Sequence, residues 1–297
     1  MPRILIAGCG YVGEAAANRF HESGWEVEGW TASTESAEKL SSRPYRVRAV
    51  DVTDREAIAE GRASARPSID FDVVIHCVSS EGGDEEEYRR LYFEGAQNLL
   101  RAFPGATLLF TSSTSVYAQV DGSVVDETSP AEPRHAKGQI LRETEDLVLG
   151  ADGIVLRLGG IHGPGRSFFL TRFLEGSVTS HDRLINQVHR DDIVSAIALL
   201  AEQRSEFRRE IFNVVGDEPI KASDAYAWLG SRFNRRCEPF PSTTWEREAG
   251  AEGSRKSKRG QSNKHVSNRK LRALGWTPRY PTFEVAMNES ILPSFGL

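Results

Sequence analysis

Residues 3–14 read R-I-L-I-A-G-C-G-Y-V-G-E, and this stretch decides the fold. Its first five residues form a short apolar run, which is typical of a buried parallel strand. Gly8, Gly10 and Gly13 follow with the spacing G-x-G-x-x-G, and helix-forming residues continue to a stop at Gly24. A strand that passes through this pattern into a helix indicates a loop that binds the pyrophosphate of a dinucleotide.

Each glycine has its own physical role in such a loop. Gly8 allows the tight turn, Gly10 lets the backbone approach the phosphates, and Gly13 lets the helix pack close to the strand. The free N–H groups at the helix start, around Tyr11 and Val12, then face the anion. The alternative is a glycine-rich turn that holds no ligand.

The rest of the chain alternates strands with helices. Further strands are predicted at 25–30, 45–50, 71–78, 106–111 and 154–158, with helices at 34–40, 54–60, 84–103 and 135–149. This order predicts an α/β protein with a Rossmann doubly wound parallel sheet. The pattern then loosens, with helices expected at 168–175, 190–203, 221–234 and 263–274 and short strands at 184–187 and 210–214. We expect an NAD(P)-binding Rossmann domain at 1–160, and at 161–297 a mainly substrate-binding lobe that is interleaved with the Rossmann core.

Composition limits the classes of function. The 297 residues carry a net charge of 37 − 42 = −5, which excludes a strongly basic nucleic-acid binder. We expect the basic run at 255–264 to be a solvated loop rather than a nucleic-acid contact. Cys9, Cys77 and Cys237 form no Cys-x-x-Cys pair, which argues against disulfides and a zinc site and favours a reducing compartment. No apolar run fits a signal peptide or a membrane span, so we expect a cytoplasmic protein that does not bind membranes.

The end of the second strand bears on the choice between NAD and NADP. An acidic residue there would bind a free ribose 2′-hydroxyl, but residues 29–33 read G-W-T-A-S. Thr31 and Ser33 can hydrogen-bond a 2′-phosphate, with Arg3 or Arg43 as helpers, which slightly favours NADP. The alternative is that they only cap the next helix.

Six later segments carry a family resemblance. They are Asp51-Val52, T-S-S-T-S-V-Y at 111–117, R-L-G-G-I-H-G-P-G-R at 157–166, N-Q-V-H-R-D-D-I at 186–193, I-F-N-V at 211–214 and S-N-R-K-L-R-A-L-G-W at 267–276. In this order they resemble an extended short-chain dehydrogenase/reductase of the NAD-dependent epimerase/dehydratase kind, over nearly the whole chain. The resemblance implies a C-terminal substrate lobe and a Ser113 hydroxyl that hydrogen-bonds the reacting oxygen. The further cofactor contacts that we expect are Asp51 and Val52 at the adenine, with Cys77, Val78, Gln139 and Ile161 elsewhere.

The sequence departs from this family at the catalytic pair Tyr-x-x-x-Lys. In the family the lysine lowers the pKa of the tyrosine, which acts as general acid/base. Residues 133–143 read P-R-H-A-K-G-Q-I-L-R-E, and aligning Glu143 with the family's glutamate puts His135 and Gln139 at those two positions. Lys137 lies about 200° around the helix from His135 and would face away from it. The chain therefore resembles an atypical subgroup, whose members are commonly named nucleotide-sugar epimerases.

Four residues are candidates for work at the substrate. His135 has an ordinary pKa of about 6.5 and needs no lysine to act near neutrality, although it can also be a plain surface residue at a helix start. Tyr117 is a second candidate proton donor, or its ring only packs against a loop. His162 and Arg166 are expected to contact substrate, since a guanidinium pairs a phosphate or carboxylate bidentately; a loop role and a surface salt bridge are their alternatives.

Two other groupings allow more than one interpretation. His189, Asp191 and Asp192 suggest a metal, but the resemblance favours a helix cap, so we expect no metal. One apolar stripe fits either a homodimer contact or packing on the sheet; its members are Ile140, Leu141, Thr144, Leu147 and Val148.

These observations support two hypotheses of different class. The first is an NAD(P)-dependent oxidoreductase or epimerase that acts on a hydroxyl-bearing carbon of a small molecule, with a sugar nucleotide as the example that the resemblance suggests. The second is a dinucleotide-binding regulatory or redox-sensing protein without turnover, which the missing Tyr-Lys pair favours.

Overall fold

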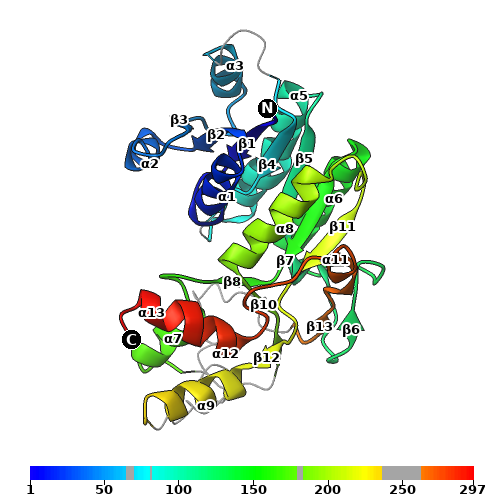
Figure 1. Ribbon diagram of the computed structural model, residues 1–297. Coiled ribbons are helices and arrows are strands. Elements are labelled where there is room, and N and C mark those ends of the chain that lie inside the picture. Colours follow the sequence, from blue (N-terminus) through cyan, green and yellow to red (C-terminus); the bar gives the residue numbers. More distant parts are fainter. Residues whose placement is uncertain (65–69, 81, 179–182, 236–261) are drawn as a thin grey trace.

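A seven-stranded parallel sheet forms the centre of the computed structural model, which describes residues 1–64, 70–80, 82–178, 183–235 and 262–297. The strand order is β11-β7-β5-β4-β1-β2-β3 (Figure 1). The strands are β1 (Arg3–Ala7), β2 (Glu26–Thr31), β3 (Arg46–Ala49), β4 (Val73–His76), β5 (Thr107–Ser113), β7 (Ile154–Leu158) and β11 (Ile211–Val214). The order reverses direction next to β1, which confirms the predicted doubly wound Rossmann sheet.

Helices cover both faces of this sheet (Figure 1). On one face α1 (Tyr11–Glu22) and α8 (Arg190–Glu202) bury Phe20, Ile193 and Ile197 in one hydrophobic cluster. On the other face α3 (Arg55–Ser64), α5 (Gly95–Ala102) and α6 (Ala136–Gly150) contribute to a second cluster. The short α2 (Thr34–Lys39), beside β3, buries no side chain. Covering on both sides explains why the central strands are apolar throughout.

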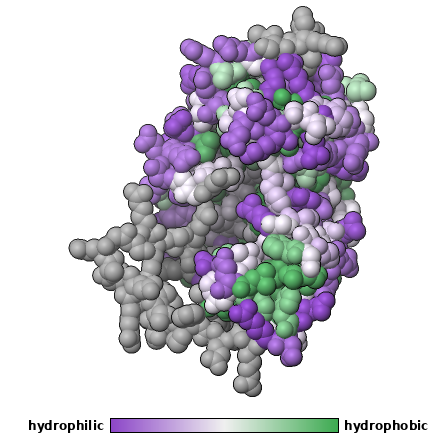
Figure 2. Space-filling view, turned by 90° about the vertical axis from the view of Figure 1, so that its left-hand side faces the viewer, coloured by the Kyte–Doolittle hydropathy of each residue, from purple (hydrophilic) through white to green (hydrophobic). Residues whose placement is uncertain are grey.

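A third hydrophobic cluster lies beyond the carboxyl edge of the sheet. It joins α7 (Phe168–Leu174), α9 (Ala222–Arg232), α12 (Phe283–Ala286), the π-helical η4 (Met287–Ile291) and α13 (Leu292–Ser294). Phe169 meets the rings of Tyr226 and Phe283 edge to face. Figure 2 shows apolar residues gathered on one outer face of the molecule, and Phe168, at the start of α7, is 59% exposed.

Short strand pairs connect this part to the sheet. They are β8 (Gly160–His162) with β10 (Gln187–His189), β9 (Leu184–Ile185) with β12 (Ile220–Lys221), and β6 (Val124–Val125) with β13 (His265–Val266). The single strand that we predicted at 184–187 is therefore two strands with different partners. The helix predicted at 263–274 is wrong in its first half, because β13 precedes α11 (Arg269–Ala273). The reason is tertiary: the N–H of Val266 donates to Oδ1 of Asn186, so this backbone is extended.

The helix predicted at 84–103 is broken into three geometries. It consists of α4 (Glu85–Tyr88), a π-helical segment η1 (Arg89–Glu94) and α5. The Leu91 carbonyl in η1 accepts a hydrogen bond from Nε2 of His76, 3.1 Å away at the end of β4. A side chain outside the helix thus hydrogen-bonds a carbonyl within the π-helical segment. Helical periodicity in the sequence does not reveal this feature.

The apolar stripe of α6 packs within its own chain. Ile140, Leu141, Thr144 and Val148 are all buried, with Thr144 donating to the carbonyl of Ile140. This geometry favours the sheet-packing interpretation of the stripe over the dimer interpretation. Within the described ranges, no helix has the length and apolar character needed to cross a membrane.

Candidate functional site

The loop between β1 and α1 has the shape that its three glycines predict. Gly8 has φ = 99°, and a Cβ on it would lie 2.6 Å from the backbone of Cys77 and Val78. A Cβ on Gly13 would lie 2.2 Å from the carbonyl oxygen of Gly8, so α1 approaches the loop closely. A Cβ on Gly10, by contrast, would meet nothing within 4 Å. Two glycines are therefore required by the fold, and the third keeps a space clear.

The start of α1 offers donors to an anion in that space. Gly10 is its N-cap and no side chain caps the helix, so N–H groups of the first turn, at Tyr11 and Val12, remain for a ligand. The helix dipole adds a positive potential at the same point. We call the open space at Gly10, together with the uncapped N–H groups of Tyr11 and Val12, the cradle. Its shape and its donors fit the pyrophosphate of a dinucleotide.

At the adenosine end of the predicted site, the candidate side chains already bind other groups of the protein. The Thr31 hydroxyl donates to the Ser33 carbonyl (3.1 Å), and the Ser33 hydroxyl caps α2 by accepting from the Ser36 N–H (3.2 Å). Arg43 is ion-paired with Glu14 of α1. This arrangement favours the cap interpretation of Ser33.

Arg3 is not available as a helper for a 2′-phosphate. It opens β1, at the sheet edge opposite the phosphate loop, and its Nε binds Glu26 at 2.9 Å. Five residues of strand, about 16 Å, separate it from the carboxyl edge.

The other strand ends that we expected at the cofactor surround the same edge. Asp51 stabilises its own turn by accepting from the Thr53 N–H (2.8 Å), and the Val52 carbonyl accepts from Asn98 (3.0 Å). Cys77 and Val78 follow β4 and form the wall against Gly8. The Cys77 thiol donates to the Gly8 carbonyl (3.3 Å), and burial raises its pKa. Ile161 lies in β8 and is half-buried.

Three successive hydroxyls at the end of β5 differ in what they bind. Thr111 donates to the His76 carbonyl (3.2 Å), and Ser112 donates to Glu145 (2.6 Å). Ser113 instead accepts, from the Ser115 N–H (3.2 Å), and its hydroxyl hydrogen has no acceptor among the described residues. Of the three, Ser113 is the one that retains a proton to donate to a substrate oxygen.

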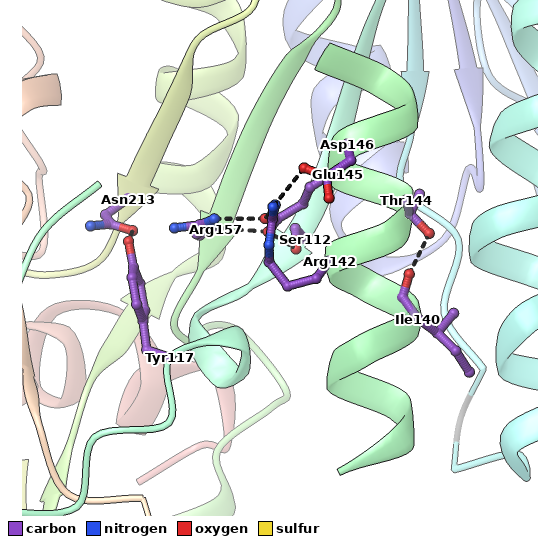
Figure 3. A network of polar contacts seen from close by, with 9 residues as sticks. All are labelled: Ser112, Tyr117, Ile140, Arg142, Thr144, Glu145, Asp146, Arg157 and Asn213. Atoms are coloured by element: carbon purple, nitrogen blue, oxygen red, sulfur yellow. Dashed lines mark hydrogen bonds and ion pairs between the residues drawn. The ribbon is translucent and has the colours of Figure 1, made fainter. Parts of the chain in front are cut away.

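Tyr117 lies a few residues farther along, after the 3₁₀ turn η2 (Thr114–Val116), and its side chain is buried. Its hydroxyl donates to Oδ1 of Asn213 (2.9 Å), and the Arg157 guanidinium lies 4.8 Å from its ring (Figure 3). Burial raises its pKa. The geometry favours the packing interpretation of Tyr117, since its proton is already committed within the core.

His135 is the N-cap of α6. Its Nδ1 accepts from the Gly138 N–H at 2.9 Å, and a Cβ on Gly138 would lie 2.8 Å from the imidazole ring. An imidazole that accepts through Nδ1 is neutral and carries its proton on Nε2. Protonation of Nδ1 would break this cap. Gln139, four residues after His135, is exposed.

Lys137 faces away from His135, as the helical spacing predicts. Because α6 begins at Ala136, the ammonium reaches the Gly83 carbonyl in the loop after β4 and lies 5.3 Å from the Tyr88 ring. It contributes no charge beside the His135 imidazole.

The glutamate used for the alignment is exposed. Glu143 is 47% exposed and pairs with Arg89, whereas Glu145 is fully buried and binds Arg157 (Figure 3). Counting back from Glu145 rather than Glu143 would place Lys137 and Leu141 at the Tyr and Lys positions. In either register the Tyr-x-x-x-Lys pair is absent.

A junction of buried histidines closes the site on the side of the C-terminal lobe. His162 and His189 end the paired strands β8 and β10, with ring centroids 5.8 Å apart. His189 caps α8 through Nδ1, which accepts from the Asp191 N–H (3.1 Å), and its Nε2 contacts the Ser290 hydroxyl (2.9 Å). The helix-cap interpretation of this segment thus agrees with the geometry. Arg166, expected at the substrate, is exposed just beyond this junction.

These histidines predict an acid-labile fold. Burial lowers the pKa of His76 to about 4, of His162 to about 3 and of His189 to about 4. The unfolded chain takes up protons near pH 6.5 while the native state does not, so stability is lost as the pH falls below 6.5. At pH 5 each histidine should lower the free energy of unfolding by about 2 kcal/mol relative to its value at neutral pH. Asp192, whose pKa burial raises to about 6, acts in the opposite direction but is one group against three.

Melting curves between pH 7.5 and 5 measure this dependence. The melting temperature should fall steadily below pH 6.5, and His162→Asn should flatten the profile relative to its own value at pH 7.5. His21→Asn, a substitution in α1 outside the buried group, serves as the control with an unchanged profile. A melting temperature constant over this range would contradict the prediction.

Some sequence-based candidates lie outside the described residues, namely Cys237 and most of the basic run at 255–264. In the part of the chain that the structure describes, no three His, Cys, Asp or Glu side chains gather as a metal site would require. One residue that the sequence analysis passed over is Arg190, which lies 5.1 Å from the Tyr11 ring beside the phosphate loop. Its position within N-Q-V-H-R-D-D-I, directly after the histidine that ends β10, is the sequence signal for it.

Comparisons with known proteins place the chain in a family. Residues 4–215 match the model of the NAD dependent epimerase/dehydratase family. The chain is 30% identical over 217 residues to Protein YeeZ of Escherichia coli, covering 68% of this chain and 74% of that one. It is 27% identical to a 3-diazoavenalumate denitrifying reductase of a Streptomyces species, covering 95% and 97%. A solved structure from Methylobacillus flagellatus, described as an NAD-dependent epimerase/dehydratase, is 28% identical with a TM-score of 0.77, covering 100% and 99%.

The family match covers the sheet from the second residue of β1 to the end of β11, and so includes the phosphate loop and the end of β5 that carries Ser113. Fold, loop geometry and sequence therefore agree: this chain belongs to the NAD dependent epimerase/dehydratase family.

Proposed function

We propose that the protein is an NADP(H)- or NAD(H)-dependent oxidoreductase or epimerase that acts on a hydroxyl-bearing carbon of a small molecule. The observation that carries the proposal is the cradle at Gly10, open where a Cβ would point and faced by the uncapped start of α1. Similarity to a reductase over nearly the full length of the chain supports the oxidoreductase alternative. The family supports the epimerase arm, with sugar nucleotides as the substrate class to test first.

The residues would divide the work at the reacting oxygen. When bound, the nicotinamide supplies or accepts a hydride. Ser113 donates its free hydroxyl hydrogen to the substrate oxygen, which stabilises negative charge there, and the His135 imidazole at the start of α6 is the second group that we place beside that oxygen. Because Nδ1 of His135 already accepts from the Gly138 N–H, we assign the imidazole an orienting contact rather than full proton transfer. His162 and Arg166 remain the proposed substrate contacts.

The choice of dinucleotide remains part of the proposal. No acid stands at the tip of β2 to bind a ribose 2′-hydroxyl, and Arg43, which pairs with Glu14, is the cation nearest to this end of the loop. We therefore favour NADP slightly over NAD. Three cysteines without a paired motif support a reducing, cytoplasmic compartment.

A thermal-shift titration with NAD, NADH, NADP and NADPH tests the proposal. Ligand at a hundred times its dissociation constant should stabilise the protein by about 2.7 kcal/mol, which raises the melting temperature by several degrees. A shift with NADP and NADPH alone would support the proposed contacts of Thr31, Ser33 and Arg43 with a 2′-phosphate. The absence of a shift with all four would refute cofactor binding.

The rival function is dinucleotide binding without turnover. It is favoured by the missing Tyr-Lys pair and by the engaged atoms of Tyr117 and His135. A thiol-based redox sensor has less support, because burial raises the pKa of Cys9 to about 12 and keeps the thiol protonated. Consumption of NADPH with any member of a carbonyl-substrate panel would exclude the rival, whereas binding without consumption would support it.

A further inference from the structure

Two arginines meet on the first residue of α1. The guanidinium carbon of Arg190 lies 5.1 Å from the centre of the Tyr11 ring, and that of Arg166 lies 5.4 Å from it. Arg190 begins α8, whereas Arg166 ends the turn that follows β8, so two distant parts of the chain converge here. Tyr11 immediately follows Gly10, which places both cations beside the open cradle.

The turn that carries Arg166 is held firmly against the phosphate loop. The Tyr11 hydroxyl donates to the Pro164 carbonyl at 3.0 Å. Gly163 and Arg166 exchange two backbone hydrogen bonds of 2.9 and 3.0 Å, and the Gly165 N–H donates to Ser294 at 2.9 Å. A Cβ on Gly163 would lie 2.7 Å from the Tyr11 hydroxyl, so the junction leaves no slack. The backbone of the turn is thus fixed against Tyr11, and contacts with the Tyr11 ring place both guanidinium groups at this junction.

The charges at this junction do not cancel. Asp191 pairs with Nε of Arg190 at 2.9 Å, but Arg166 has no carboxylate within ion-pair distance among the described residues. The imidazoles of His162 and His189 are neutral because burial lowers their pKa. An uncompensated guanidinium, exposed to solvent, therefore stands beside the uncapped N-terminus of α1.

We propose that Arg166 and Arg190 form a phosphate-binding pair at the mouth of the cradle, with Tyr11 as the residue that positions them. Guanidinium groups match phosphate oxygens bidentately, and a preformed pair holds them at low entropic cost. The proposal rests on dinucleotide binding at the loop. The phosphate is that of the cofactor's own pyrophosphate or that of a phosphorylated substrate bound next to it.

Calorimetric titrations of Arg166→Gln, Arg190→Gln and the double variant distinguish these sources. The probes are NADPH, inorganic pyrophosphate on the free protein, and inorganic phosphate on the NADPH-saturated protein. Arg172→Gln is the matched control, since Arg172 also lies over an aromatic ring, Phe168 at 5.6 Å, but on α7. Melting curves check that each variant is folded, and the exposed Arg166 provides a variant without buried contacts to lose.

If the pair binds the cofactor, each substitution should weaken NADPH and pyrophosphate binding about tenfold, the loss expected for one charged hydrogen bond. If it binds a substrate phosphate, NADPH affinity should stay within twofold and the saturated protein should lose its phosphate binding. Equal affinities for all three probes in wild type and double variant would overturn the proposal. Should the wild type bind no dinucleotide, the proposed function fails, and pyrophosphate binding alone still decides for or against the arginine pair.

Discussion

Replacing Gly10 with valine should abolish dinucleotide binding and leave the melting temperature of the free protein nearly unchanged. The Cβ of the new side chain enters a space where it meets no other atom within 4 Å, so the Cβ itself displaces no part of the fold. The same space is where the pyrophosphate would contact the backbone. Losing two charge-assisted hydrogen bonds there should weaken binding by roughly a hundredfold or more. NADPH fluorescence titration and melting curves measure the two effects separately.

Two control glycines make this experiment specific. Gly105→Val also places its Cβ in open space, at the end of the sheet far from the loop, and should bind dinucleotide like the wild type. Gly13→Ala should instead lower the melting temperature, because its Cβ would lie 2.2 Å from the Gly8 carbonyl oxygen. A Gly10→Val protein that still binds NADPH with wild-type affinity would show that the cradle is not the phosphate site.

Removing the buried carboxylate of Glu145 should be among the most destabilising single changes in the chain. Its two oxygens accept from Ser112 (2.6 Å), from Nε and Nη2 of Arg157 (3.0 and 2.7 Å) and from Arg142 (2.7 Å). Glu145→Ala leaves Arg157 as a buried cation without a carboxylate to balance its charge, which should cost about 3–5 kcal/mol. For a domain of this size that corresponds to a fall in melting temperature on the order of 10 °C.

Two comparisons separate this effect from a general loss of charge. Glu143 lies two residues before Glu145 in the same helix. Glu143→Ala removes an exposed ion pair with Arg89 and should lower the free energy of unfolding by less than about 1 kcal/mol. The double variant Glu145→Met, Arg157→Met removes both charges and should recover much of the stability lost in Glu145→Ala. Equal melting temperatures for Glu145→Ala and Glu143→Ala would contradict the network in Figure 3.

The order of the strands and the shape of the phosphate loop were predictable because both depend on local rules. A buried parallel strand needs a continuous apolar run, and a tight turn into a helix needs glycines at fixed offsets, so residues 3–14 carry their own structure. The same locality explains the success of the helical spacing argument for Lys137. These features require no knowledge of distant residues.

The roles of the polar side chains were not predictable in this way. His135 and Tyr117 are ordinary candidates for acid/base work by residue type, but contacts with Gly138 and Asn213 engage Nδ1 of the first and the hydroxyl of the second. The two glutamates of α6 differ by only two positions, and one is buried against Arg157 while the other faces Arg89. Nothing in the local sequence distinguishes them, since burial depends on what packs against each side of the helix.

By itself, then, the sequence determined the Rossmann sheet, the phosphate loop and the loss of the Tyr-x-x-x-Lys pair, because each is written in consecutive residues. Tertiary structure alone decided which of the three hydroxyls after β5 keeps its proton, and it alone brought Arg166 and Arg190 together on Tyr11. Tyr11 lies 166 − 11 = 155 positions from Arg166 and 190 − 11 = 179 positions from Arg190, so they meet only through packing of separate elements. A hydrogen bond or a charge has its meaning only from what lies within a few ångströms of it.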